Sequence, residues 1–394
     1  MVEASSRWTY PALIGLLMVS LGISAAPSPL YGIYAETWGF EPITTTVVFA
    51  AYALAALLSV LVSGAISDRY GRRPILLVAS VGLVAGLLLF TVAGSVPVLI
   101  VARVLHGMSV GAIVVVATAA LLDLRPGDGA ATGRRTGIAF NVGIFLTILA
   151  TATDAEYGPA PLVVPYAVLA ALAAVGFVAV LLMPETHAVD RSVPLAIARP
   201  RVPAQISGDF AFAALGVMAS WSVLGVFLSL FPTIATVAAD TDNLVFGGIV
   251  VGGMALAAAV SQQLSGGWDA RRSAVVGDVG TAASLGGCVL AVHVGNGWLL
   301  AAVSVVLGFF FGLAFGSSLR HLGQVVPPAH RGEVMSAFYV LAYSALAVPT
   351  IIAGAAATQW GVDAIFAPFM ACVAVACLTA GVLGSRVRGV QPDA

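Results

Sequence analysis

The chain has 394 residues, of which 60% are hydrophobic and 9% are charged, and its formal net charge is -1. Soluble domains are about 45–50% apolar and about 25% charged, so a mean hydropathy of +1.03 excludes a soluble enzyme, a nucleic-acid-binding protein and a disordered chain. The apolar runs are continuous rather than alternating, which predicts membrane-spanning helices and not the strands of a barrel.

Twelve apolar runs follow one another along the chain, and each is long enough for a helix that crosses a bilayer, which needs about 20 residues. The predicted spans are residues 11–34, 43–66, 74–95, 97–123, 137–155, 160–183, 206–232, 243–264, 273–294, 297–319, 333–357 and 363–384. The sequence therefore predicts an all-α membrane protein with twelve transmembrane helices.

The charged residues divide between the two sides of this map, and all 17 basic residues are arginines. Sixteen of them lie before, after or between spans on one side: Arg7, Arg69, Arg72, Arg73, Arg125, Arg134, Arg135, Arg191, Arg199, Arg201, Arg271, Arg272, Arg320, Arg331, Arg386 and Arg388. The opposite loops carry only acids: Glu36, Glu41, Asp154, Glu156, Asp240, Asp242 and Asp363. Because basic residues in short loops remain cytoplasmic, we expect a multi-pass protein of the plasma membrane with both termini in the cytoplasm.

The middle of the chain divides it into two halves. The longest connection, residues 184–205, is rich in proline and arginine. The loop after the second span reads SDRYGRRP and the loop after the eighth reads WDARRSA, which places Asp68 and Asp269 about half a chain apart. We predict an N-terminal six-helix bundle at 1–183, a cytoplasmic linker at 184–205 and a C-terminal six-helix bundle at 206–394, an arrangement typical of transporters.

The sharpest motif, GAISDRYGRRP, lies in the loop after the second span. Its candidate gating residues are Gly64, Asp68, Arg69, Gly71, Arg72 and Arg73. Gly64 would allow two helices to approach closely, and Gly71 would permit a tight turn. Asp68 lies between a helix end and several guanidinium groups, so it can form charge-assisted hydrogen bonds that hold the two halves together.

With this motif the chain resembles the major facilitator superfamily, whose loop between spans two and three carries Gly-x-x-x-Asp-Arg-x-Gly-Arg-Arg. The twelve spans, the degenerate copy near Asp269 and the sequence PET at 184–186 extend the resemblance over essentially the whole chain. The resemblance implies two pseudo-symmetric six-helix bundles. It also implies that Asp68 and Arg72 belong to a cytoplasmic gate that holds the outward-facing state.

A second motif, RVLHGMSVG, lies in the fourth span, where Arg103, Gly107 and Gly111 share one helix face with His106 beside it. Arg103 is the one arginine inside a predicted span. A charge at the bilayer centre costs about 2.5–3.5 kcal/mol, so Arg103 either faces protein or a water-filled cavity or extends to the membrane surface. The pattern resembles the Arg-x-x-x-Gly motif of proton-coupled drug exporters, which implies proton coupling through Arg103, with His106 and Asp123 as further candidates.

Two features depart from those exporters. Their fifth span has Gly-Pro, whereas Gly143 is followed by Ile144 in this chain, and the predicted first span holds no acid. Pro27 and Pro29 predict a bend in that first span.

Polar side chains inside the spans could line a transport path. The cavity candidates are Ser24, Ser28, Tyr31, Asn141, Trp221, Tyr339 and Tyr343. Small polar residues also pack helices together in lipid, which is the alternative for each of them. We expect Asp209 and Asp278 to be solvated near the cytoplasmic ends of their spans, and we assign no role to His293 and His321, which also lie near span ends.

The sequence favours a secondary transporter that works by alternating access, in which proton-coupled efflux of a small amphipathic compound is the leading hypothesis. An uptake carrier or facilitator for a sugar or organic acid is the alternative, and a membrane-embedded enzyme or scaffold is a third hypothesis.

Without lysine there can be no ATP-binding Gly-x-x-x-x-Gly-Lys motif, and no His/Cys cluster has metal-ligand spacing. We therefore expect no enzyme activity, no cofactor and no metal, and a monomer whose partners are a small-molecule substrate, protons and the lipid bilayer.

Overall fold

The computed structural model describes residues 2–189, 191, 200–327 and 330–386, and the regular structure within them is helical. In chain order the elements are α1 (Val2–Ile23), η1 (Ser28–Leu30), α2 (Tyr31–Trp38), α3 (Pro42–Tyr70), α4 (Arg72–Thr91), α5 (Val96–Leu124), α6 (Gly129–Tyr157), α7 (Val164–Leu182), η2 (Ala204–Ile206), α8 (Ser207–Ser229), α9 (Phe231–Ala238), α10 (Leu244–Leu264), η3 (Ser265–Gly267), α11 (Ala270–His293), α12 (Gly297–Val325), α13 (Arg331–Trp360) and α14 (Val362–Arg386).

Twelve helical segments in the described part of the chain are long and apolar enough to cross a membrane. They coincide with the twelve predicted spans, so the predicted all-α, twelve-span fold is confirmed. The ends differ by a few residues. The first span continues to Trp38 and the tenth to Val325, because charged and polar residues at a helix end stop an apolar run without stopping the helix.

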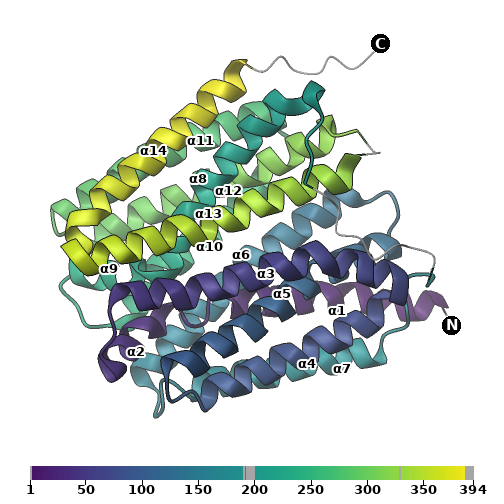
Figure 1. Cartoon of the computed structure of the whole chain (residues 1–394), viewed down its shortest axis with the longest axis horizontal. Helices are drawn as coiled ribbons and strands as arrows, with labels where there is room; N and C mark the ends of the chain where they lie inside the picture. The colour runs from purple at the N-terminus through teal and green to yellow at the C-terminus, as the bar shows by residue number, and fades with distance from the viewer. Residues whose placement is uncertain (1, 190, 192–199, 328–329, 387–394) are drawn as a thin grey trace.

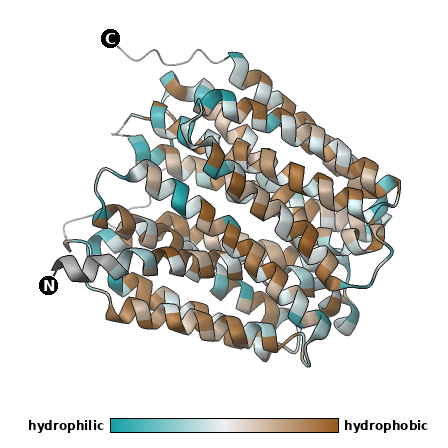
Figure 2. Ribbon diagram, turned by 180° about the vertical axis from the view of Figure 1, so that it is seen from behind, coloured by the Kyte–Doolittle hydropathy of each residue, from teal (hydrophilic) through white to brown (hydrophobic). Residues whose placement is uncertain are grey.

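The outer surface of the helix bundle is apolar, as lipid contact requires. Leu58, Val78 and Val175 expose 65%, 73% and 68% of their surface, respectively. Figure 2 shows hydrophobic residues along the middle of the helices and hydrophilic residues gathered at the helix ends. A membrane therefore takes the place of water around this band.

The helices α1–α7 lie on one side of the molecule and α8–α14 on the other (Figure 1). The pairs α3–α13 and α6–α10 join the two sides. The start of α1 and the end of α14 lie at the same end of the bundle. This end also carries the starts of α4, α6 and α11, with Arg72, Arg134 and Arg271, and is called the arginine-rich end. The opposite end, with Glu36 and Asp363, is called the acidic end.

The predicted linker at 184–205 lies between α7 and η2. Residues 184–189, 191 and 200–205 are described, and the others lie outside the described residues. At its far end, the backbone N–H of Arg201 donates to the carbonyl oxygen of Glu333 in α13 at 3.4 Å. This bond ties the end of the connection to the second half of the chain.

Glycines bring matching helix pairs together in the two halves. A Cβ on Gly107 of α5 would overlap the Tyr52 carbonyl oxygen of α3, and a Cβ on Gly308 of α12 would overlap the Met254 carbonyl oxygen of α10. Small residues let helix backbones approach closely in lipid, where apolar burial alone does not drive association. The same device therefore sets the packing of the fourth span on the second and of the tenth on the eighth.

The first span of each half is broken near the acidic end. In the first half α1 ends at Ile23, η1 follows and α2 begins at Tyr31; in the second half α8 ends at Ser229 and α9 begins at Phe231. The break in the first span contains Pro27 and Pro29, which confirms the predicted bend. Such a break leaves backbone carbonyl groups without their helical partners, so other groups must bond them.

Candidate functional site

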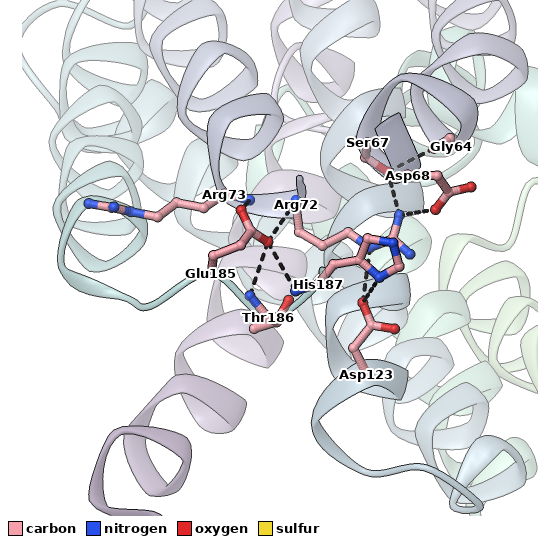
Figure 3. A network of polar contacts seen from close by, with 9 residues as sticks. All are labelled: Gly64, Ser67, Asp68, Arg72, Arg73, Asp123, Glu185, Thr186 and His187. Atoms are coloured by element: carbon pink, nitrogen blue, oxygen red, sulfur yellow. Dashed lines mark hydrogen bonds and ion pairs between the residues drawn. The ribbon is translucent and has the colours of Figure 1, made fainter. Parts of the chain in front are cut away.

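Arg72, the first residue of α4 after the turn at Gly71, is the centre of a polar network at the arginine-rich end (Figure 3). Its Nη1 donates to Ser67 Oγ at 2.6 Å and also to Asp68 Oδ1, and its Nε donates to Asp123 Oδ2 of α5 at 3.0 Å. Its side chain is 7% exposed. The guanidinium therefore links the end of α3 to the end of α5 by charge-assisted hydrogen bonds within the first half. The predicted bonds of Asp68 between the two halves are not found among the described residues, because Arg72 of the same half binds its carboxylate.

The turn between α3 and α4 depends on Gly71 and on a distant carboxylate. Gly71 has φ +96°, which confirms the predicted tight turn, since this backbone conformation favours glycine. The first N–H groups of α4 have no helical acceptor, and Glu185 supplies one: Oε1 accepts from Arg72 N at 2.8 Å and Oε2 from Arg73 N at 3.0 Å. Figure 3 shows Glu185 beneath these two residues.

The other motif residues add to the same corner. Arg73 donates to the carbonyl oxygens of Val180 and Leu181, which lie at the end of α7. The Arg69 guanidinium lies 5.7 Å from the Tyr70 ring centroid. Gly64 differs from expectation: a Cβ there would make an ordinary 3.5 Å contact with Val115 Cγ1, so the approach of α3 to α5 at this level does not require glycine.

Close contacts between α6 and α10 fill the space between the halves at the arginine-rich end. A Cβ on Gly137 of α6 would overlap Gln262 Oε1 of α10, and a Cβ on Gly266 would lie 3.0 Å from Arg134 Nη1. Arg320 of α12 donates to the carbonyl oxygens of Ser265 and Gly266 at 2.8 and 2.9 Å. The contacts of Gly137 and Arg134 with the second half pack the two halves against each other at this end, and Arg320 holds η3 in place within the second half.

A cavity of about 600 Å³ lies at the acidic end, between the halves. Its wall comes from α2 and the start of α3 on one side, and from α9 and the ends of α8, α11 and α14 on the other. Tyr31 and Glu36 line it from the first half, and Thr233 and Asp363 from the second. Glu36 and Asp363 are exposed, so the cavity opens at this end.

Arg103 lies behind the cavity wall, with 1% of its surface exposed. This burial excludes an extension to the membrane surface. Nη1 donates to the Ser24 carbonyl oxygen at 3.1 Å, a group that the break in the first span leaves free, and Nη2 donates to Tyr31 Oη at 2.6 Å. The guanidinium carbon also lies 5.0 Å from the Tyr52 ring centroid and 5.7 Å from that of Phe49, distances at which cation–π attraction acts.

Arg103 has no carboxylate partner among the residues that the structure describes. Neutral oxygens and ring faces hold its charge, and Tyr31 is the group through which it reaches the cavity. An anion that entered the cavity and displaced the Tyr31 hydroxyl would meet a guanidinium that has no carboxylate partner.

The two other proton-coupling candidates lie apart from the cavity. His106 packs between the rings of Tyr52 and Phe90, at 5.3 and 6.1 Å between centroids, and neither ring nitrogen has a hydrogen-bond partner in the described structure. Asp123 is twenty residues from Arg103 along α5, or about 30 Å, and belongs to the Arg72 network, where His187 Nδ1 also lies 3.5 Å from its Oδ2.

The seven predicted cavity candidates do not line one cavity but lie in several different surroundings. Tyr31 lines the large cavity, and Asn141 lines a void of about 10 Å³ between the halves. Ser24 and Ser28 are buried at the break in the first span. Trp221 of α8 packs on Tyr343 of α13 with ring centroids 5.0 Å apart. Tyr339 packs on the Phe338 ring at 6.0 Å.

Sequence reasoning missed several charged residues. Glu36 was outside the predicted first span because the helix extends beyond the apolar run. The expectation that Asp209 and Asp278 are solvated is wrong: Asp209 Oδ1 lies 2.7 Å from His321 Nε2 with both side chains largely buried, and Asp278 has 0% exposure. The signal for Asp278 was its position inside the apolar run 273–294, since acids within spans are rare.

No cluster of His, Cys, Asp or Glu in the described ranges could hold a metal ion.

Comparisons with known proteins agree on the fold. The family model of the Major Facilitator Superfamily matches residues 12–348. No curated protein sequence matches the chain. Among solved structures, the human organic anion transporter MFSD10 (TETRAN) is 16% identical with a TM-score of 0.70, covering 96% of this chain and 99% of that one. A variant of the nucleoside transporter NupG is 13% identical with a TM-score of 0.70, covering 94% and 99%. A POT family transporter in complex with 5-aminolevulinic acid is 12% identical with a TM-score of 0.76, covering 95% of each chain.

Proposed function

The chain belongs to the Major Facilitator Superfamily, and from this premise we propose that it carries a small amphipathic compound out of the cell in exchange for protons. In this proposal the halves 1–183 and 206–394, joined by the linker, rock against each other so that a central path opens to one side at a time. The protein acts as a monomer in the plasma membrane, with the arginine-rich end and both termini in the cytoplasm.

The cavity at the acidic end is the observation that carries the proposal. It has a volume of about 600 Å³, which suits a drug-sized solute. Its wall combines apolar side chains with Tyr31, Thr233, Glu36 and Asp363, so it offers both apolar surface and a few polar groups. With the arginine-rich end inside the cell, a cavity open at the acidic end and close helix contacts at the other end correspond to an outward-facing conformation.

The motif residues Gly64, Asp68, Arg69, Gly71, Arg72 and Arg73 are proposed to form the cytoplasmic gate. Arg72 binds the carboxylates of Asp68 and Asp123 at the ends of two helices, and Glu185 holds the start of α4. Movement of α3 relative to α5 would have to break these charge-assisted bonds. All of these residues precede α8, so the network supports a role in fixing the helix ends of the first half, against which the second half closes in the outward-facing conformation.

Coupling to protons is proposed to involve Arg103. A buried guanidinium raises the cost of any further positive charge beside it and lowers the cost of a negative one. Protonation of a nearby group or arrival of a substrate would therefore change how firmly Arg103 holds Ser24 and Tyr31. Both groups lie at the break in the first span, where a change in bonding can alter the helix geometry.

A ligand-stabilisation screen tests the substrate class first. Purified protein is heated with a panel of amphipathic neutral, cationic and anionic compounds at two pH values, because a ligand of the folded state raises its melting temperature. A compound that stabilises the protein is then loaded into proteoliposomes with an imposed pH gradient. Flux that follows the gradient supports exchange with protons, and flux indifferent to it contradicts proton coupling.

Uptake or facilitated diffusion of an organic acid is the second candidate, and the unpaired Arg103 guanidinium favours it. Tyr31 both lines the cavity and bonds Arg103, so a carboxylate could replace the hydroxyl as the guanidinium's partner. The variant Arg103→Gln separates the candidates. If it abolishes stabilisation by anionic compounds, the organic-acid carrier is favoured; if binding persists and only gradient-driven flux is lost, proton-coupled efflux is favoured.

A further inference from the structure

Asp278 is a carboxylic acid enclosed between three helices of the second half. It lies on α11, about 12 Å from the first residue of that helix, and 0% of its surface is exposed. Neither carboxyl oxygen has a hydrogen-bond partner among the described residues. A Cβ on Gly216 of α8 would lie 2.8 Å from Oδ1, and a Cβ on Gly381 of α14 would lie 4.0 Å from the Asp278 Cβ, so the acid occupies space that two glycines leave.

Among the described residues, none packed against Asp278 supplies an opposite charge. The Cys377 thiol of α14 is close enough to interact with it. On α8 the nearest titratable group is Asp209, two turns away, which pairs with His321 of α12. On α11 itself, Arg271 lies two turns away and donates to the Gly384 carbonyl oxygen at 3.1 Å. Since a buried carboxylate without a partner is very costly, burial favours the neutral, protonated form of this acid in this conformation.

An apolar layer separates Asp278 from the arginine-rich end. One turn closer to that end, a Cβ on Gly384 would lie 2.5 Å from Phe212 Cε2 and 2.7 Å from Val275 Cγ2, so Phe212 and Val275 pack together over this glycine. The Phe212 ring in turn lies 5.7 Å from the His321 ring. The acid is therefore close to a polar, titratable pair but separated from it by side chains of α8 and α11.

We propose that Asp278 is a proton-binding site of the second half. The carboxyl group holds its proton while the cavity is open at the acidic end. When α8 and α14 shift and separate Phe212 from Val275 and Gly384, water enters from the arginine-rich end. The O–H bond then breaks, the proton passes to water, and the carboxylate that remains is solvated. This inference rests on the proposed proton-coupled transport, for which it supplies the titrating group that Arg103 cannot be.

The first test detects the proton directly and needs no substrate. Purified protein in vesicles of ether-linked phosphatidylethanolamine and phosphatidylglycerol, which carry no ester carbonyl group, is studied by infrared spectroscopy at about pH 8, where exposed carboxyl groups are ionised. We expect a C=O stretching band of a protonated carboxylic acid in the unaltered protein, its loss in Asp278→Asn and its retention in Asp242→Asn, which neutralises an exposed acid of the same half. Absence of the band from the unaltered protein, or its persistence in Asp278→Asn, overturns the proposal.

The second test asks whether this proton is coupled to transport. Ethidium, a fluorescent amphipathic cation, is followed in the same vesicles with and without a pH gradient. Asp278→Asn should reduce gradient-driven accumulation to the level seen with the gradient collapsed, while downhill equilibration and the melting temperature stay within about twofold and a few degrees of the unaltered protein. Accumulation equal to that of the unaltered protein, or loss of both fluxes with a lowered melting temperature, contradicts a coupling role.

The two proposals can fail separately. If ethidium flux in the unaltered protein ignores the gradient, proton-coupled export of this cation fails, whereas the infrared result still decides whether Asp278 binds a proton. If flux follows the gradient but the band or the coupling survives in Asp278→Asn, the transport proposal stands and the assignment to Asp278 fails.

Discussion

The two halves of the molecule enclose ionisable groups of opposite kind. In the first half, the Arg103 guanidinium is hydrogen-bonded to Ser24 and Tyr31 and lies against aromatic rings. In the second half, the Asp278 carboxyl has no hydrogen-bond partner among the described residues. A guanidinium cannot lose its charge in a protein, so it must be solvated by the fold, whereas a carboxylic acid can become neutral. Arg103 therefore carries a fixed charge, whereas Asp278 can gain or lose a proton.

The helix frame of the halves is the same, so it does not account for the difference. Gly107 and Gly308 have equivalent packing roles and are separated by the same number of residues as Asp68 and Asp269. With that separation, Ser304 corresponds to Arg103 and Leu77 corresponds to Asp278. Each buried ionisable group is thus present in one half only, and packing requirements alone do not select it.

The arginine-rich ends of the halves differ in the same way. Ser273 corresponds to Arg72, so the second half lacks the guanidinium that links two helix ends in the first. Asp269 remains, but its Oδ1 accepts from Arg272 N at 2.7 Å and caps the start of α11. A residue that joins an interhelical network in one half therefore serves local helix capping in the other.

The largest loss of stability is expected from a change in the glycine-mediated helix packing that the two halves share. Gly308→Leu would force a side chain against the Met254 carbonyl oxygen of α10, and we expect a loss of at least about 3 kcal/mol of stability or failure to fold. Gly286→Leu, on an exposed face of α11 with nothing near its Cβ position, is the control and should change the melting temperature by little. A melting curve of purified Gly308→Leu like that of the unaltered protein would contradict the packing role.

The Arg72 network should show the asymmetry of the halves. Arg72→Gln leaves the carboxylates of Asp68 and Asp123 without their shared cation, and we expect a loss of about 2–3 kcal/mol of stability. This is below the range for a fully buried pair because the Asp68 side chain is 43% exposed. The corresponding Ser273→Ala should cost less than about 0.5 kcal/mol. Equal shifts of melting temperature in the two variants would show that Arg72 has no special role.

The twelve spans and the turn at Gly71 could be predicted from the sequence because they depend on local properties. Hydropathy is summed over neighbouring residues, and a positive φ is specified by glycine itself. The arginine distribution likewise needs only the order of the spans. These features do not depend on which distant helices meet.

The environments of individual charged residues could not be predicted, because distant segments create them. Asp278 is buried by Gly216 and Gly381, which lie on α8 and α14 and are far from it in the sequence. The family resemblance marked Glu185 as part of PET, but no local pattern indicates that its carboxylate caps α4. Glu36 joins the cavity wall because the first span continues beyond its apolar run.

The Glu185 cap should contribute a smaller amount than Arg72. Glu185→Ala removes the acceptor of two backbone N–H groups at the start of α4, and we expect a loss of about 1–2 kcal/mol from capping and helix-dipole interactions. Glu185→Gln keeps an acceptor oxygen but not the charge and should lose about half as much. Thermal unfolding in detergent measures both, and no shift in either would show that other groups satisfy these N–H groups.

The cap at Asp269 should give the smallest effect, since it satisfies a single backbone N–H. Asp269→Ala removes the acceptor of Arg272 N and should cost about 0.5–1 kcal/mol, whereas Asp269→Asn should be nearly neutral because asparagine caps as well as aspartate. The ratio of the stability losses in these two variants distinguishes a role in helix capping from a role of the negative charge. If Asp269→Asn cost as much as Asp269→Ala, the charge of Asp269 would matter, as that of Asp68 is expected to in the first half. The second half would then hold its arginine-rich end by an electrostatic contact of its own.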